Sequence, residues 1–247
     1  MTMGRQFDTN HLPFPMPKRS HALSQSWHTL TFLHWEIHPN ALEAHLPPGL
    51  EIDLFEGRAF VGTIPFWMKH VRPRWLPSVP FVSSFPEFNV RTYVIKDGKP
   101  GVYFLTLDAQ SMVTCMYATR AYGLPYRYAS CRLKVKPHRY EWSSKRRSDG
   151  VSLVGHAEAY GPILTAERGT LEYFLFERYC LYSVHKGKLH RGYTHHNPWE
   201  FQEATAHVQS NTLTESYDLG IADVLNPDII HVSSGVDVHT WTMELVE

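Results

Sequence analysis

Residues 84–127 read SFPEFNVRTYVIKDGKPGVYFLTLDAQSMVTCMYATRAYGLPYR, and this stretch decides the fold. It contains a strand with alternating side chains, a turn at Asp-Gly, a second apolar strand, a helix-like segment from Ser111 to Tyr122 and a Gly-Leu-Pro-Tyr exit. We expect Asp108 to cap the helix and Gly123 to end it, because Asp favours helix N-termini and Gly favours the left-handed residue that follows a helix.

Polar residues occupy every second position of the first strand. Glu87, Asn89 and Arg91 therefore share one face, whereas Phe88 and Val90 point to the other. If the polar face looks outward, it is ordinary solvated surface. If it looks into a closed sheet, it forms a ligand site that already holds a carboxylate and a guanidinium.

Composition excludes several classes of partner. The 247 residues carry no formal net charge, and 43% are apolar but only 19% charged. We expect no nucleic acid or anionic membrane as a partner, because the chain has no basic field, and the apolar content predicts a large core. No apolar run approaches the roughly 20 residues that span a bilayer, and no secretion signal is recognisable, so we expect a soluble, cytoplasmic protein.

Sixteen histidines and three cysteines raise the question of a metal site. His195 and His196 are adjacent, and a strand would send them to opposite faces. The other histidines lack the spacing that converges on one ion, and the cysteines form no Cys-x-x-Cys pair. The sequence therefore predicts no metal ion and no other cofactor.

The rest of the chain alternates short apolar runs with Pro and Gly turns. We expect an extended, Pro-rich arm over residues 1–25 and a single domain over residues 26–247. Helices are expected at 41–46 and 171–179, and further strands at 27–37, 50–55, 59–68, 126–135, 140–145, 151–160, 180–184, 189–196, 204–211 and 236–244. This pattern indicates a mainly β fold, as an antiparallel barrel or a strongly curved sheet.

A Pro-rich connection occupies residues 69–86. A loop of this length inside a compact domain is usually functional or mobile. Two interpretations stay open, a surface crossover and a lid over the pocket.

Seven segments in order resemble the YqjF-like family, a domain of unknown function within the acetoacetate-decarboxylase-like superfamily. They are WHTLTFLHWEI (27–37), LPPGLEID (46–53), SSFPEFNVRTYV (83–94), DGKPGVYFLTLDA (97–109), RAYGLPY (120–126), FLFERYCLY (174–182) and HHNPWEFQEA (195–204). The similarity extends from about Trp27 to the C-terminus. It implies a cone-like antiparallel β barrel with an interior cavity, assembled into homo-oligomers.

The resemblance to acetoacetate decarboxylase also carries chemistry. That enzyme forms a Schiff base on a lysine that follows a proline, and a second lysine lies next to it. Here Pro125 is followed by Tyr126 and Arg127, so the nucleophile is absent and decarboxylation through an imine is not expected. The resemblance also places Glu87 at one of the enzyme's active-site glutamates and Arg120 at the arginine upstream of its lysine pair.

The candidate site follows from both arguments. Its predicted catalytic residues are Glu87, Tyr126 and Arg120, and its predicted ligand-binding residues are Asn89, Arg91, Arg127, Trp67 and Phe85. A guanidinium suits a planar carboxylate, and Tyr126 can donate to a carbonyl oxygen. Glu87 can act as a general acid or base if burial raises its pKa. The alternative is that Glu87 pairs with an arginine as a structural ion pair.

Three functions remain open at this point. The chain is an enzyme or former enzyme for a small carboxylate or carbonyl compound, a non-catalytic ligand-binding or sensor barrel, or a structural or interaction protein with a filled barrel. A cavity of roughly 300 Å³ or more beside Glu87 would count against the third.

Overall fold

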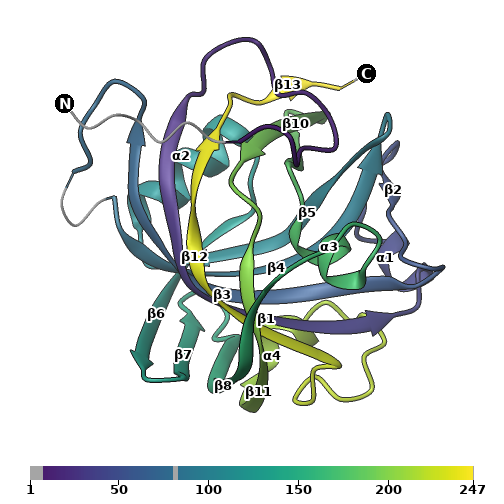
Figure 1. The fold of residues 1–247 in the computed structure, drawn as a ribbon, viewed down its shortest axis with the longest axis vertical. Helices are drawn as coiled ribbons and strands as arrows, with labels where there is room; N and C mark the ends of the chain where they lie inside the picture. Colours follow the sequence, from purple (N-terminus) through teal and green to yellow (C-terminus); the bar gives the residue numbers. More distant parts are fainter. Residues whose placement is uncertain (1–7, 80–82, 247) are drawn as a thin grey trace.

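One continuous hydrogen-bonded sheet of thirteen strands organises the computed structural model, which describes residues 8–79 and 83–246 (Figure 1). The strands are β1 (Leu23–Ile37), β2 (Glu51–Ile52), β3 (Ala59–Pro73), β4 (Phe85–Lys96), β5 (Lys99–Ala109), β6 (Tyr126–Lys136), β7 (Arg139–Arg146), β8 (Ser152–Thr165), β9 (Cys180–His185), β10 (Lys188–His195), β11 (Glu200–Asn211), β12 (Ile229–Thr240) and β13 (Glu244–Leu245). The helices of these described residues are α1 (Asn40–Glu43), α2 (Met112–Tyr122), α3 (Leu171–Phe176) and α4 (Thr212–Glu215). The predicted mainly β fold is confirmed.

The sheet closes on itself along two routes. Both routes share β12, β1, β3, β4 and β5. From β5, one returns to β12 through β6, β7, β8 and β11, and the other returns through β9 and β10. Figure 1 shows β6, β7, β8 and β11 at the lower end of the molecule and β10 with α2 at the upper end.

Two parallel pairings add a detail to the predicted antiparallel barrel or strongly curved sheet. β5 pairs in parallel with both β6 and β9. Parallel neighbours require a crossover connection, and α2 supplies it between β5 and β6. The result is a branched, mainly antiparallel sheet rather than a simple barrel.

The N-cap of α2 also differs from the prediction. Ser111 caps the helix, because its hydroxyl oxygen accepts a hydrogen bond from the Thr114 backbone N–H at 3.3 Å. Asp108 instead lies buried in β5, three residues earlier. Gly123 ends the helix in the left-handed conformation, at φ 66°, as predicted.

Strands extend into both the predicted N-terminal arm and the predicted loop 69–86. β1 begins at Leu23, within the predicted arm, of which residues 1–7 lie outside the described residues. β3 runs to Pro73 and β4 begins at Phe85, so the connection between them covers residues 74–84 rather than the predicted 69–86. Residues 80–82 of it also lie outside the described residues, and the lid stays a prediction.

Two β-bulges turn extra side chains toward one face of the sheet. β1 has one more residue than β3 between His28 and Leu33, and Thr29 there has a positive φ of 53°. β5 has one more residue than β4 opposite the step from Val90 to Arg91. A bulge shifts the alternation of side chains by one position. Two residues that flank the bulge and are three positions apart therefore face the same side.

The two faces of the central strands have different surroundings. One apolar cluster packs against one face and includes Trp35 and Phe88 with Trp142 and Leu153 from β7 and β8. A second cluster packs against the other face and includes Phe32, Phe85 and Trp199. In the described residues, no helix is long and apolar enough to cross a membrane.

Candidate functional site

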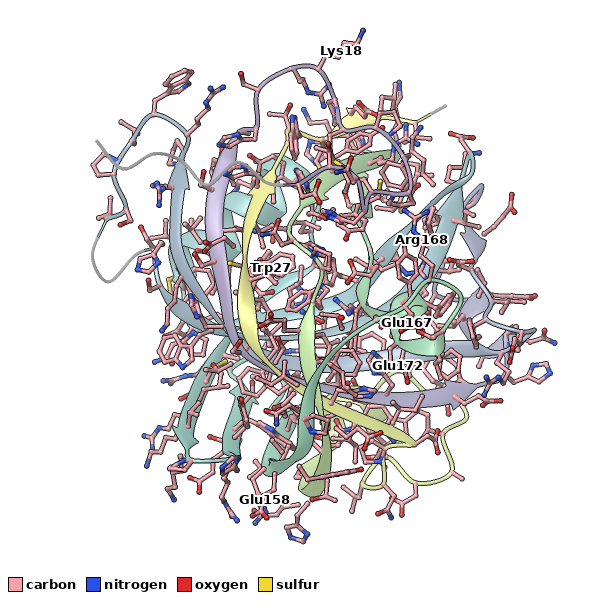
Figure 2. All side chains as sticks on the ribbon, viewed as in Figure 1. Lys18, Trp27, Glu158, Glu167, Arg168 and Glu172 are labelled. Atoms are coloured by element: carbon pink, nitrogen blue, oxygen red, sulfur yellow. The ribbon has the colours of Figure 1, made fainter. Side chains whose placement is uncertain are left out.

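A cavity of about 350 Å³ lies on the β4 face that carries Glu87, Asn89 and Arg91. Its walls come from β1, β3, β4, β5, α2, β6, β9, β10 and β12 and are mainly apolar. Trp27 is one of the wall residues, and Figure 2 shows it in the middle of the molecule, between Lys18 and Glu158 at opposite ends. The polar face of β4 therefore looks inward. The presence of this cavity argues against an interior that is filled by the protein's own side chains.

Glu87 is buried in this wall, with 2% of its surface exposed. The Tyr126 hydroxyl donates a hydrogen bond to its Oε2 at 2.8 Å. Burial raises the pKa of Glu87 to about 7, although hydrogen bonds from Tyr126 and Asn89 favour the ionised form. Among the described residues, no lysine or arginine forms an ion pair with Glu87, so the structural ion pair is not observed there.

Tyr126 reaches Glu87 because β6 begins immediately after Pro125 and runs parallel to β5. Burial and the neighbouring Glu87 raise the pKa of the Tyr126 phenol well above its ordinary value. The phenol therefore keeps its proton and acts as a hydrogen-bond donor. Glu87 is the group of this pair that exchanges a proton near neutral pH.

Arg91 brings a cation to the same wall. Its Nη2 donates to the Leu175 carbonyl oxygen at 3.2 Å, and its guanidinium lies over the Phe32 and Tyr93 rings at 5.8 and 5.7 Å. No carboxylate of the described residues pairs with it. Its buried Nε and the buried Oδ1 of Asn89 have no hydrogen-bond partner among residues 8–79 and 83–246. Such groups are costly to bury, and they indicate a place for a ligand or for water.

The other predicted site residues divide into two groups. Phe85 is buried and lines the cavity. Trp67 packs on the opposite apolar cluster, because its neighbours Phe66 and Met68 face the cavity. Arg127 follows Tyr126 along β6 and is exposed on the other face.

Arg120 also lies away from the cavity. It is exposed near the end of α2, whose residues Cys115 and Ala118 are buried. The structure does not bring Trp67, Arg127 or Arg120 to the cavity wall. The role that the resemblance implies for Arg120 stays a prediction.

Several wall residues were not predicted from the sequence. Trp27 and Leu30 both face the cavity because of the bulge in β1, and Phe104 and Leu107 do so because of the bulge in β5. Phe66 lies directly opposite Glu87 in the β3–β4 register. Only Phe66 had a sequence signal, since it alternates with Met68 along one strand.

Among the described residues, no histidine or cysteine side chain lines the cavity. In the described part of the chain, no group of three His, Cys, Asp or Glu side chains is placed to hold a metal ion. All three cysteines are free and buried. Burial raises the thiol pKa of Cys115 to about 11 and of Cys131 and Cys180 to about 12, so they remain protonated thiols at neutral pH.

With the geometry in place, the chain can be compared with known proteins. Residues 24–237 match the family model of DUF2071, described as an uncharacterized conserved protein. The chain belongs to the DUF2071 family. It is 36% identical over 224 residues to the uncharacterized protein YqjF of Bacillus subtilis (strain 168), which covers 90% of this chain and 91% of YqjF.

Several solved structures resemble this DUF2071 member, two enzymes among them. Acetoacetate decarboxylase from Legionella pneumophila aligns with a TM-score of 0.67 at 14% identity, over 96% of this chain and 93% of the enzyme. The enduracididine biosynthesis enzyme MppR, in complex with the condensation product of pyruvate and imidazole 4-carboxaldehyde, aligns with a TM-score of 0.63 at 14% identity, over 92% of this chain and 90% of MppR. The fold is therefore that of the acetoacetate-decarboxylase-like proteins, as the resemblance implied.

Proposed function

We propose that this chain binds a carboxylate or carbonyl compound in the cavity and acts on it by acid–base chemistry at Glu87, without a Schiff-base lysine. One observation carries the proposal. Glu87 is a buried carboxyl group that titrates at about pH 7, opens onto a cavity of about 350 Å³ and has no cationic partner in the described residues. A general acid or base is most effective when its pKa lies near the working pH.

The proposed chemistry is proton transfer next to a carbonyl group. Ionised Glu87 removes a proton from the carbon beside the carbonyl, and the C–H electron pair moves into the resulting enolate. Protonated Glu87 then returns the proton to carbon. Tyr126 remains neutral throughout and holds Glu87 in place through its hydrogen bond. Arg91 offers its cation to a carboxylate on the same molecule.

Chemistry through an imine has no support from the wall of the cavity. In the described residues, none of the side chains that line it belongs to a lysine. An imine also needs an amine that is unprotonated at neutral pH. MppR, which has the same fold, holds the condensation product of pyruvate with an aldehyde, and this supports an organic acid as the class of ligand.

The first test follows proton exchange. The protein is incubated in D₂O with a panel of oxo acids and ketones, and NMR records deuterium at the carbon beside the carbonyl. We expect wild-type protein to catalyse exchange and Glu87→Gln to lose at least about 100-fold of that rate. Glu200→Gln, an exposed glutamate in β11, is the matched control and should keep the full rate.

The outcomes separate the functions that the sequence left open. Exchange that survives in Glu87→Gln would refute the assignment of Glu87. Binding without exchange for every compound would favour a non-catalytic ligand-binding protein. Borohydride treatment in the presence of ligand should leave the protein mass unchanged, and a ligand-sized mass gain on a lysine would contradict chemistry without a Schiff base.

The second test addresses Arg91. Removing a charged hydrogen-bond donor to a carboxylate costs about 1.5–3 kcal/mol, so Arg91→Met should weaken the binding of an acid by about tenfold or more. Calorimetric titration measures the dissociation constant. Arg132→Met, at an exposed arginine of β6, is the control. Equal affinity in both variants would remove Arg91 from the binding site.

A further inference from the structure

The cavity is elongated along β4. Arg91, Asn89, Glu87 and Phe85 follow one another at every second position, and all four line it. At about 3.3 Å per residue, the Cα atoms of Arg91 and Phe85 are roughly 20 Å apart. Leu23 and Pro73, which pair across β1 and β3, line the cavity beyond Phe85.

The cation and the proton-exchanging group lie at different places along this length. Four strand positions separate Arg91 from Glu87, which corresponds to about 13 Å between their Cα atoms. Arg91 contacts Tyr93 and the Leu175 carbonyl, so its guanidinium extends away from Glu87 along the strand. One three-carbon acid cannot reach both groups.

The volume of the cavity also indicates a ligand larger than a three-carbon acid. A water molecule occupies about 30 Å³ of liquid, so the cavity of about 350 Å³ has room for roughly twelve such volumes. A three-carbon acid would leave most of the apolar wall in contact with water. A ligand of ten to fourteen non-hydrogen atoms, an estimate of roughly one atom per water volume, would fill it.

The cavity wall between Arg91 and Glu87 can pack against the apolar part of a ligand. Leu30, Ile64, Phe66, Phe104 and Leu107 line the cavity on the strands around Asn89. Apart from Asn89, these side chains offer no partner to a polar group on the middle of a ligand, which would lose its hydration without compensation. Burial of methylene groups against this wall is favourable.

We propose that the ligand is an elongated, largely apolar carboxylic acid of roughly ten to fourteen non-hydrogen atoms, with its carboxylate at Arg91 and a carbonyl group several carbons away at Glu87 and Tyr126. The positions of its two polar groups rest on the proposed function. The length and apolar character of its body rest on the shape and composition of the cavity. A ligand of this size is still a small molecule, as expected from the sequence, and the proposal adds its length and its apolar body.

A chain-length series tests this ligand class on wild-type protein. Calorimetry measures the binding of straight-chain acids with four, six, eight, ten and twelve carbons, each below its micelle concentration, and of the alcohols of equal length. We expect affinity to rise by about fourfold per added CH₂ group until the cavity is full at about eight to twelve carbons. The acid should bind more tightly than the alcohol of equal length.

The same series distinguishes the failure of this inference from the failure of the proposed function. Flat affinity, or tightest binding at four carbons, with a loss in Arg91→Met would overturn the elongated ligand and keep the carboxylate site. A steep rise with chain length, but equal affinity for acid and alcohol and no loss in Arg91→Met, would overturn the carboxylate site and keep the elongated apolar ligand.

One pair of variants sharpens the result. Ala118 is buried on the side of α2 that lines the cavity, and Ala121 is exposed on the same helix. Ala118→Phe should shift the optimum to a shorter chain, whereas Ala121→Phe should leave it unchanged. An unshifted optimum in folded Ala118→Phe would contradict the proposed path of the ligand, and if that variant does not fold, the wild-type series still decides.

Discussion

Two buried carboxyl groups, Glu87 and Asp108, lie on neighbouring strands and have opposite surroundings. Glu87 is 2% exposed and Asp108 is fully buried. In the β4–β5 register Asp108 lies opposite Phe88, the neighbour of Glu87, so the two side chains point to opposite faces of the sheet. One faces the cavity and the other faces the interior that β6 and β7 enclose.

Their partners explain what each carboxyl group does. Arg146 donates from Nε and Nη2 to Asp108 at 2.9–3.2 Å, and the Thr106 hydroxyl donates to Oδ1 at 3.0 Å. Burial raises the pKa of Asp108, and the guanidinium opposes this rise. In the part of the chain that the structure describes, the partners of Glu87 are a phenol and an amide, and none is a cation. A carboxyl group that is paired in this way is structural, whereas one that titrates beside a cavity is available for chemistry.

The largest expected effect breaks the paired site. Arg146→Met leaves the Asp108 carboxylate buried without compensation and should lower the free energy of unfolding by about 3–5 kcal/mol at neutral pH. Urea denaturation measures it. A loss below about 1 kcal/mol would show that Asp108 is protonated or hydrated in the folded protein, and the contrast with Glu87 would disappear.

The next effect concerns the pH dependence of stability at Glu87. Its folded pKa of about 7 lies above the ordinary 4.5, so the folded state binds more protons between these values and stability falls as pH rises through this window. Glu87→Gln removes this loss. As pH rises from 5 to 8, the difference in unfolding free energy between the variant and wild type should therefore shift by about 2–3 kcal/mol in favour of the variant. A constant difference across this range would mean that Glu87 titrates normally.

A smaller effect comes from the phenol that hydrogen-bonds Glu87. Tyr126→Phe removes the donor that favours ionised Glu87, so the pKa of Glu87 should rise above about 7. The expected loss of stability is about 1–2 kcal/mol at pH 8 and less at pH 5. Tyr182→Phe, which removes a hydroxyl that donates to the Lys99 carbonyl, should lose stability equally at both pH values.

The smallest effect extends the comparison to the surface. Lys136 donates to Glu141 at 2.7 Å, but 61% of the lysine side chain is exposed. Solvent and salt screen such a pair, so Lys136→Ala should leave the midpoint of urea denaturation unchanged. A clear shift of this midpoint would mean that partner geometry, rather than burial, governs how much ion pairs contribute to the stability of this protein.

Parts of the site could be predicted because they depend on short-range rules. Alternation along β4 placed Glu87, Asn89 and Arg91 on one face, and the structure puts all three at the cavity. The same rule separates Arg127 from Tyr126, since neighbours on a strand face opposite sides. Arg120 could not be placed in this way, because the side of a helix that packs on the sheet depends on partners distant in sequence.

Local chemistry in the sequence determined the strands, the Asp-Gly turn, the Gly123 helix end and the shared face of three polar residues. The tertiary structure alone decided which face of β4 looks inward, because only the closure of the sheet through β5, β9, β10 and β12 creates an inside. It also decided the two bulges and the pairing of Asp108 with Arg146, 38 residues away. The pKa of Glu87 belongs to this second group, since it is burial by distant strands, and not the neighbouring sequence, that raises it.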